Sequence, residues 1–246
     1  MLKSIGSGSA FNTKLGNTSA YYKVGNQMLL IDCGSNIFHR IKENNLLEGI
    51  EHIHVLITHA HADHVGSLAD LILYSYYSHG EFSKNKITVY SPKDTKVHKV
   101  LKHNGCVEEL HFTAHDLEND YAEIESMSID VVFNKSSHVK ELTSYSINLI
   151  FSNTTSIFYS GDISELKKDV INYIESSNYT STDIAYIDTC KADYDGNVHL
   201  SLRKLSEVIK PKYRYKIWCM HLDEGFVREE AEALGFNVVK NEFQGW

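Results

Sequence analysis

The chain has 246 residues, 42% of them hydrophobic, and a formal net charge of −8 at pH 7. This is enough to bury a large core, and we expect one α/β domain over residues 1–246. The acidic balance disfavours a long nucleic acid as partner. Residues 1–6 lack a signal-peptide apolar region, and no stretch approaches the ~18 apolar residues of a membrane span. Four cysteines without a C-x-x-C motif agree with a reducing compartment, so we expect a cytoplasmic protein away from membranes.

Short apolar segments alternate with turn residues along the chain. Residues 21–28, with Gly25 and Asn26 at their centre, predict a hairpin. Apolar residues at helical spacing predict helices over 67–77 and 93–103. In the second half, strands are predicted at 144–151, 156–160, 183–188 and 213–220, and helices at 163–174, 200–209 and 224–234. Two strand-rich halves with outer helices indicate two sheets flanked by helices.

Residues 58–64 read Thr-His-Ala-His-Ala-Asp-His, directly after an apolar run. Imidazole and carboxylate groups are the ligands that divalent transition metals prefer. In extended geometry His59 and His61 project to the same side, and Asp63 and His64 follow as the chain turns into a helix. These four residues therefore predict a metal site, with Asp63 and His64 able to face a second ion.

Three further metal-ligand residues stand where apolar runs end. His138 follows the run 127–133, Asp162 ends the run 156–162, and His221 ends the run 215–221. In sheet proteins such positions open onto loops that form sites. Taken singly, each is more often a capping or hydrogen-bonded residue than a ligand. Together with the first cluster they become candidate metal ligands.

With these residues in this order, the chain resembles the metallo-β-lactamase superfamily, whose H-x-H-x-D-H signature corresponds to His59, His61, Asp63 and His64. The resemblance implies an αββα sandwich of two mixed sheets flanked by helices. It also implies two divalent metal ions, zinc or manganese. One ion would be held by His59, His61 and His138, the other by Asp63, His64 and His221, with Asp162 bridging. Asp32, at the end of an early strand, would orient the ligand loop.

Within the superfamily, the chain resembles the tRNase Z and cyclic-nucleotide phosphodiesterase branch. The resemblance rests on residues 5–10, residues 15–19 and a second histidine before His221. That histidine is His199. The branch carries an H-E-A-T stretch upstream of it, and here Ile187-Asp188-Thr189-Cys190 keeps the carboxylate but not the leading histidine. The resemblance implies a hydroxide activated by two metals, with Asp63 as a base that steers it. His199, supported by Asp188, would protonate the leaving oxygen.

The stretch from His138 to Asp162 is only 24 residues long and contains no proline. It leaves no room for the long substrate arm of tRNase Z enzymes, which favours a small phosphodiester. In this the chain is similar to the anti-Pycsar phosphodiesterases, viral enzymes that cleave cyclic mononucleotide immune signals. The resemblance implies hydrolysis of cyclic CMP, UMP, AMP and GMP to linear nucleotides, in the host cytoplasm if the protein is viral. The resemblance also implies that this hydrolysis serves immune evasion.

Three other functions stay open at this point. The first is a tRNase Z-like RNA endonuclease without the substrate arm. The second is a thioester or lactone hydrolase of the same superfamily, against which the nucleotide-branch opening counts. The third is a non-catalytic nucleotide-binding protein, which the complete set of ligand positions disfavours.

Residues 74–82 are unusually aromatic. Branch members commonly form homodimers through the helices after the metal motif, so we expect a homodimer. Candidate substrate-contacting residues, which would reach the partner's site and cover the base, are Tyr77, His79 and Phe82. A candidate dimer stripe, with ordinary core packing as the alternative, is Leu68, Leu71, Ile72 and Tyr76. A solvated helix face, or a basic patch, is predicted at Lys84, Lys86, Lys93, Lys96, Lys99 and Lys102.

Overall fold

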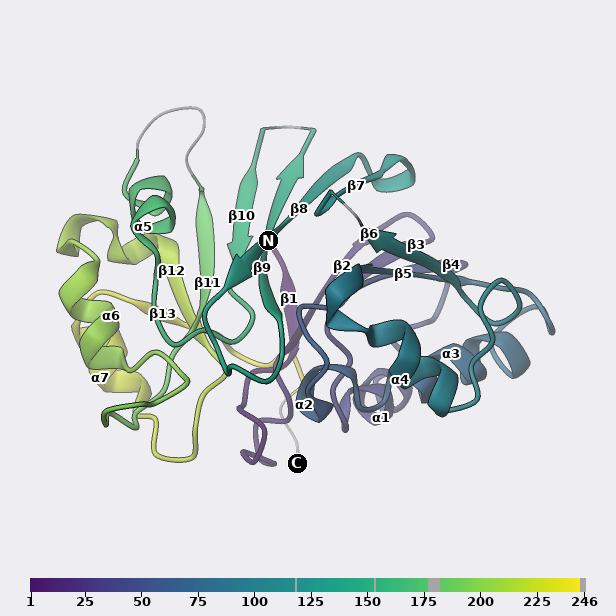
Figure 1. Cartoon of the computed structure of the whole chain (residues 1–246), viewed down its shortest axis with the longest axis horizontal. Helices are drawn as coiled ribbons and strands as arrows, with labels where there is room; N and C mark the ends of the chain where they lie inside the picture. The colour runs from purple at the N-terminus through teal and green to yellow at the C-terminus, as the bar shows by residue number, and fades with distance from the viewer. Residues whose placement is uncertain (118, 153, 177–181, 244–246) are drawn as a thin grey trace. The chain divides into compact units, whose positions relative to one another are not determined.

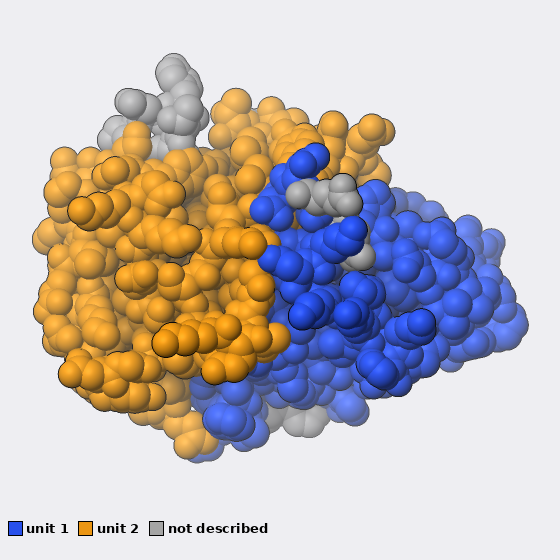
Figure 2. All heavy atoms as spheres, viewed as in Figure 1, with its two compact units in different colours: residues 1–120, 241–246 blue, residues 121–240 orange. Residues whose placement is uncertain are grey.

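The computed structural model describes residues 1–117, 119–152, 154–176 and 182–243. The chain divides into two compact units (Figure 2). Each unit is built around one sheet. Unit 1 comprises residues 1–120 and 241–246, and unit 2 comprises residues 121–240. The expectation of a single domain over residues 1–246 stays a prediction.

Unit 1 contains a six-stranded mixed sheet in which the strands follow their sequence order (Figure 1). The first three strands pair antiparallel, and the last four pair parallel, so helices must connect the parallel strands. The strands are β1 (Lys3–Gly6), β2 (Ser19–Val24), β3 (Gln27–Ile31), β4 (His52–Leu56), β5 (Ile87–Pro92) and β6 (Thr113–Leu117). The helices are α1 (Ile37–Glu43), α2 (Ala62–Val65), α3 (Leu68–Tyr77) and α4 (Val97–His103), with a 3₁₀ turn at Lys93–Thr95.

The core of unit 1 lies between one face of this sheet and the helices. Alternate residues of β4, such as Ile53 and Val55, belong to it. Leu68, Leu71 and Ile72 of α3 belong to the same core and are completely buried. The candidate dimer stripe on α3 is therefore core packing of its own chain, and those side chains are not available to a partner.

The other face of the same sheet carries a polar and aromatic cluster. His54 on β4 is buried, and its Nδ1 lies 3.1 Å from the Tyr90 hydroxyl on β5. Its Nε2 lies 3.1 Å from Oε1 of Gln27 on β3. The ring centroids of His52 and His54 are 4.7 Å apart, and the His115 ring stacks on Tyr90. Burial lowers the pKa of His54 to about 4, and the nearby His52 and His115 add to the effect.

Unit 2 contains a seven-stranded mixed sheet of order β13-β12-β11-β10-β9-β8-β7. Neighbours from β7 to β10 pair antiparallel, and neighbours from β10 to β13 pair parallel. Its three helices lie beside the parallel strands (Figure 1). The strands are β7 (Tyr121–Ile124), β8 (Ile129–Ser136), β9 (Ser144–Phe151), β10 (Ser156–Tyr159), β11 (Ile184–Asp188), β12 (Ile217–Met220) and β13 (Asn237–Val238). The helices are α5 (Lys168–Ile174), α6 (Leu202–Val208) and α7 (Arg228–Ala233), with 3₁₀ turns at Glu125–Met127 and Pro211–Lys216.

Most predicted elements are present, and the differences have local causes. The helix predicted over 93–103 is broken at Lys96, which adopts a left-handed backbone conformation with φ 59°. The strand predicted over 213–220 starts only at Ile217, because Pro211 begins a 3₁₀ turn before it. The helix predicted over 163–174 is present only as α5, because residues 161–167 form the loop after β10.

Within the residues that the structure describes, the helices are too short to cross a membrane.

Candidate metal centre

The predicted ligand motif follows β4 in unit 1: His59 and His61 lie in a loop, and Asp63 and His64 lie in α2, as expected. We call this segment loop 58–64. His59 and His64 are buried, and His61 and Asp63 are half-buried. The Nε2 atom of His59 lies 3.0 Å from Nδ1 of His61, and Nε2 of His64 lies 3.4 Å from Oδ2 of Asp63. The loop thus brings its four predicted ligands together as two close pairs.

Asp32 holds this loop in place through hydrogen bonds. It follows β3, is fully buried, and accepts hydrogen bonds from the Thr58 backbone N–H and the Thr58 hydroxyl, each at 2.8 Å. Nδ1 of His64 lies 2.8 Å from the same carboxylate, and Nδ1 of His59 lies 3.1 Å from the Thr58 hydroxyl oxygen. Both rings therefore donate through Nδ1, which leaves Nε2 as the nitrogen that carries the lone pair.

Gly34 allows the loop to come this close. A Cβ atom at this position would lie 2.0 Å from the Asp63 carbonyl oxygen, so a larger residue would displace the loop. Beside it, the Cys33 N–H donates to the His64 carbonyl oxygen at 2.6 Å.

The other candidate ligands lie at one edge of the unit 2 sheet. Asp162 follows β10, Asp188 ends β11 and His221 follows β12, and the carboxyl ends of parallel strands meet at the same edge. His138 follows β8, which runs parallel to β10 through the two antiparallel pairings with β9. The sheet topology explains why residues 83 positions apart in the sequence converge.

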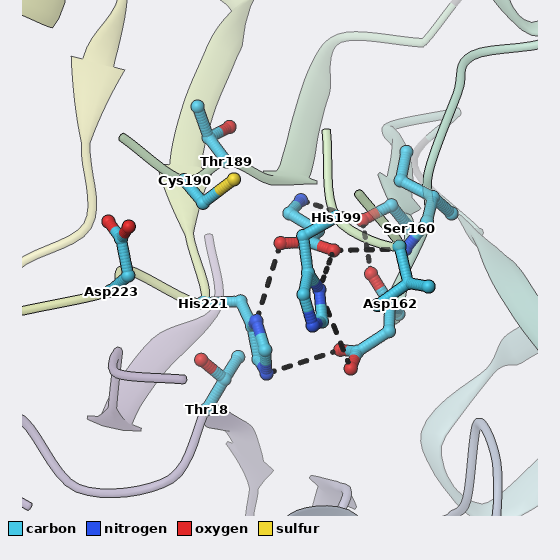
Figure 3. A network of polar contacts seen from close by, with 12 residues as sticks. Thr18, Ser160, Asp162, Thr189, Cys190, His199, His221 and Asp223 are labelled. Carbon is cyan, nitrogen blue, oxygen red and sulfur yellow. Dashed lines mark hydrogen bonds and ion pairs between the residues drawn. The ribbon is translucent and has the colours of Figure 1, made fainter. Parts of the chain in front are cut away.

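Asp162 lies close to His221 (Figure 3) and to a second imidazole of unit 2, that of His138. Its Oδ1 is 3.4 Å from Nε2 of His221, and its Oδ2 is 3.7 Å from Nε2 of His138. Nδ1 of His138 donates to the Val198 carbonyl oxygen at 3.1 Å, and Nδ1 of His221 lies 3.3 Å from Oδ1 of Asp188. In both rings Nε2 is again the nitrogen directed at the cluster.

His199 stands at the margin of this cluster. Its Nδ1 donates to Oδ2 of Asp188 at 2.8 Å, its ring stacks on His221, and its side chain is 26% exposed. Burial lowers the pKa of His199, but the charge and hydrogen bond of fully buried Asp188 outweigh this, so the net pKa is raised. A partly exposed imidazolium that is held at Nδ1 by a carboxylate is suited to proton donation through Nε2.

Both ligand sets fit a metal ion. Metal-binding histidines almost always donate their second N–H to a neighbouring acceptor, and His59, His64 and His138 each donate through Nδ1 here, while Nδ1 of His221 lies 3.3 Å from Asp188. Zinc–nitrogen and zinc–oxygen distances of about 2.0–2.1 Å place neighbouring ligand atoms of a tetrahedral site about 3.3 Å apart. The observed separations of 3.0 to 3.7 Å match this value.

The sequence alone did not reveal several of these contacts. Thr58 links Asp32 to His59, and the Val198 carbonyl orients His138. Asp188 was expected to support His199, and it also lies against His221. Backbone partners leave no residue pattern. Thr58 was not predicted, although its hydroxyl group and its position directly before the motif could have indicated it.

The three predicted substrate residues are in unit 1, around the end of α3. The Tyr77 hydroxyl lies 3.2 Å from Nε2 of His111, and the Phe82 ring lies 6.1 Å from that of Tyr77. Nε2 of His79 donates to the Ile50 carbonyl oxygen at 2.9 Å. Tyr77 and Phe82 are exposed, whereas His79 holds two parts of unit 1 together.

Of the six lysines predicted to form a solvated helix face, Lys86 is an exception. Lys86 is buried, and its Nζ donates to the carbonyl oxygens of Ser75, His79 and Glu81. It therefore fastens the loop after α3. The other five lysines are exposed, as the solvated-face interpretation predicts.

With this geometry in hand, we compared the chain with known proteins. The profile of the family described as anti-Pycsar protein Apyc1 matches residues 1–243. This chain belongs to that family. The Apyc1 protein of Bacillus phage vB_BveM-Goe7 is 30% identical over 241 residues, covering 89% of this chain and 88% of the relative. The Apyc1 protein of Paenibacillus harenae is 27% identical over 248 residues, covering 97% and 96%.

Solved structures similar to this Apyc1 family member have the metallo-β-lactamase fold. A diphosphatase of the PhnP family superposes with a TM-score of 0.74 at 17% identity, covering 98% of this chain and 95% of its own. The metallo-β-lactamase fold protein YhfI of Bacillus subtilis gives 0.73 at 16% identity, covering 98% and 97%. The short form of human tRNase Z gives 0.71 at 15% identity, with the same coverage. The predicted fold class is confirmed.

Proposed function

We propose that this protein is a metal-dependent phosphodiesterase that hydrolyses small cyclic nucleotides to linear nucleotides and so counteracts a cyclic-nucleotide immune signal inside a host cell. Membership of the anti-Pycsar family supports the biological role. The observation that carries the chemistry is the His199–Asp188 pair, a proton donor at the margin of an imidazole and carboxylate cluster. Cyclic CMP, UMP, AMP and GMP are the proposed substrates.

We propose that the predicted ligands hold two divalent ions and that residues 1–246 act as one hydrolase domain. His59, His61 and His138 would hold one ion, and Asp63, His64 and His221 the other, with Asp162 shared. The common Nε2 presentation of the rings supports this assignment. Zinc fits the donor set best, because imidazole nitrogen and carboxylate oxygen are ligands it accepts in tetrahedral sites.

Bound divalent ions would lower the pKa of a water molecule and offset negative charge on the phosphoryl group. The half-buried carboxylate of Asp63 would accept the proton of the attacking water. As the new P–O bond forms and the P–O bond to the ribose breaks, Nε2 of His199 would give its proton to the departing ribose oxygen. Asp188 would stabilise the imidazolium before transfer and keep Nδ1 protonated.

A product assay tests the function. Metal-loaded protein is incubated with the four cyclic mononucleotides and, in parallel, with a 3′-extended tRNA precursor. We expect linear nucleotides and intact RNA. Trimmed RNA with intact cyclic nucleotides would instead identify an RNA-processing nuclease and contradict the proposal. A protein that releases neither product would also contradict it.

Two substitutions test the roles of the residues. His199→Ala should keep its metal and lose roughly 10²–10⁴ in rate, the range of a general acid. Asp162→Ala should lose metal, measured by elemental analysis, because both neighbouring imidazoles converge on this carboxylate. His103→Ala, which removes an exposed imidazole at the end of α4, is the matched control and should change neither property. Near-native turnover of His199→Ala would remove it as the proton donor.

We also propose a homodimer in which the segment after α3 contributes to the neighbouring subunit's substrate site. The exposed rings of Tyr77 and Phe82 support this interpretation, since the α3 stripe is buried. Replacing both with serine should raise KM for cyclic nucleotides and leave the metal content unchanged. Sedimentation velocity of wild type and variant measures the subunit number. A monomeric wild type, or an unchanged KM, would contradict the proposal.

A further inference from the structure

The turn that carries His199 is closed at its base. It connects β11 to α6 and spans residues 189–201. The Cys190 N–H donates to the Leu200 carbonyl oxygen at 3.0 Å, and the Leu202 N–H donates to the Cys190 carbonyl oxygen at 2.9 Å. Because Asp188 precedes this closure and His199 lies just inside it, the turn decides whether the two side chains meet.

Asn197 spans the inside of this turn. Its Nδ2 donates to the Ala192 carbonyl oxygen at 2.8 Å, and its Oδ1 accepts the His199 backbone N–H at 3.1 Å. Nδ2 also lies 3.3 Å from Sγ of Cys190. Only 8% of the residue is exposed. One amide thus uses its donor on the first half of the turn and its acceptor on the second, a division of roles that few other side chains can reproduce.

Asp223 fastens the same turn to the loop that follows β12. Its Oδ1 accepts the Lys191 N–H at 2.8 Å, and its Oδ2 accepts the Ala192 N–H at 3.1 Å. Asp223 lies two residues after His221 (Figure 3). Ala192 therefore has its N–H held by Asp223 and its carbonyl held by Asn197. The chain of contacts runs from the His221 loop through Ala192 to the backbone of His199.

The far side of the turn is tied to α6. The Ser201 hydroxyl donates to Oδ1 of Asp193 at 2.9 Å, and its oxygen accepts the Lys204 N–H at 3.2 Å as the helix cap. Arg203 also pairs with Asp193. The ion pair between Arg203 and Asp193 lies at the surface, where such pairs contribute little. The buried amide of Asn197 is the stronger constraint on His199.

We propose that Asn197 and Asp223 are positioning residues that hold the proton donor His199 in line with the leaving oxygen. This inference rests on the proposed function, in which His199 protonates that oxygen. Neither residue is assigned contact with substrate or metal. Their loss should therefore reduce proton donation specifically and leave nucleophilic attack in place.

Leaving-group dependence separates this role from a general loss of structure. A ribose oxygen needs a proton as it departs, whereas p-nitrophenolate leaves as a stable anion without one. Asn197→Ala should lose about 10–100-fold in kcat on a cyclic nucleotide, a fraction of the full general-acid contribution. On bis-p-nitrophenyl phosphate it should lose less than about threefold, as His199→Ala should. KM and metal content should be those of the wild type.

Two companion variants sharpen the comparison. Asn197→Asp keeps an acceptor for the His199 N–H and loses the donor to Ala192, so it should fall between wild type and Asn197→Ala on the cyclic nucleotide. Asn237→Ala is the matched control, because Asn237 also donates to backbone carbonyl oxygens of unit 2, at Tyr215 and Ile217. It should change neither rate by more than about twofold.

The outcomes distinguish the inference from the proposed function. Equal losses on both substrates, with metal retained, would overturn the positioning role and leave the phosphodiesterase assignment intact. A wild type that cleaves the aryl diester but no cyclic nucleotide would overturn the proposed function, and this inference with it. If Asn197→Ala fails to fold, Asp223→Asn decides by the same pair of rates, since it keeps one acceptor oxygen for the turn.

Discussion

Acid should destabilise unit 1 through His54, and His54→Gln should remove much of that sensitivity. The imidazole is only 7% exposed and contacts two polar partners on neighbouring strands, Gln27 and Tyr90. Gln27 Oε1 accepts a hydrogen bond from the Nε2–H group, so Nδ1 of the neutral ring accepts a hydrogen bond from the Tyr90 hydroxyl. A protonated ring has no acceptor left for that hydroxyl, and it carries a buried charge.

The size of the effect follows from the pKa of His54. Folding lowers it from the ordinary value of 6.5 to about 4, chiefly by burial. Because the folded pKa is below the unfolded one, the unfolded state binds more protons between these values. The stability that the neutral His54 ring contributes is complete above pH 6.5 and is lost as the pH falls toward 4. At 1.36 kcal/mol per pKa unit the total is roughly 3 kcal/mol, of which about 2 kcal/mol is lost between pH 7.5 and pH 5.

Urea unfolding at pH 7.5 and pH 5.0 measures this loss, with a chelator present so that metal release does not contribute. The difference in unfolding free energy between the two pH values should be about 2 kcal/mol smaller for His54→Gln than for wild type. His39→Gln, which removes an exposed imidazole on α1, should keep the wild-type difference. If His54→Gln also keeps it, the ring is not held neutral by its surroundings and the reasoning fails.

Two further predictions concern unit 1. Lys86→Met should lower the unfolding free energy by about 3 kcal/mol and speed proteolysis within residues 78–85, because three backbone carbonyls lose their donor. The control Lys84→Met, which replaces an exposed lysine, should change neither quantity. Equal effects of the two substitutions would refute the anchoring role of Lys86. Glu242→Gln should lower stability by under about 1 kcal/mol at pH 7, since Glu242 pairs with Lys3 at 2.6 Å on a partly exposed surface. Burial raises the pKa of Glu242, but Lys3 and Tyr21 outweigh it and hold the pKa below 4.5, so this contribution exists above pH 4.5 and disappears as the pH falls through the lowered value. Unfolding curves of wild type and Glu242→Gln should therefore converge in acid, and a constant difference down to pH 3 would contradict this.

The candidate ligands were predictable because two simple rules act together. Metal-ligand residues at strand ends stand out in the sequence, as His138, Asp162 and His221 do, and parallel strands bring their carboxyl ends to one edge. The ligand residues within 59–64 are so close in the sequence that they also lie close together in space. The strand pattern was predictable for the same reason, since buried parallel strands read as apolar runs.

What the sequence could not reveal depends on partners that are distant or belong to the backbone. Lys86 reads as one of six surface lysines, and only the carbonyl oxygens around its Nζ make it an interior residue. The apolar residues of α3 have the same spacing whether they face a sheet or a second subunit. Left-handed Lys96 carries no residue signal, because lysine is not a residue that favours that conformation. These features follow from tertiary contacts.

The edge of the unit 1 sheet has a consequence for how the protein is made. β1 is the outermost strand, and Asn241 and Glu242 cover it through a parallel bridge at Ser4 and a hydrogen bond from the Glu242 N–H to the Ser4 carbonyl oxygen at 3.1 Å. Lys3 and its partner Glu242 are 239 positions apart in the chain. At about 5–20 residues per second, a ribosome therefore leaves this edge uncovered for roughly 10–50 s. During that interval the backbone groups at the outer edge of β1 have no partner from residues 241–242, and they form a template on which a strand of another chain can pair.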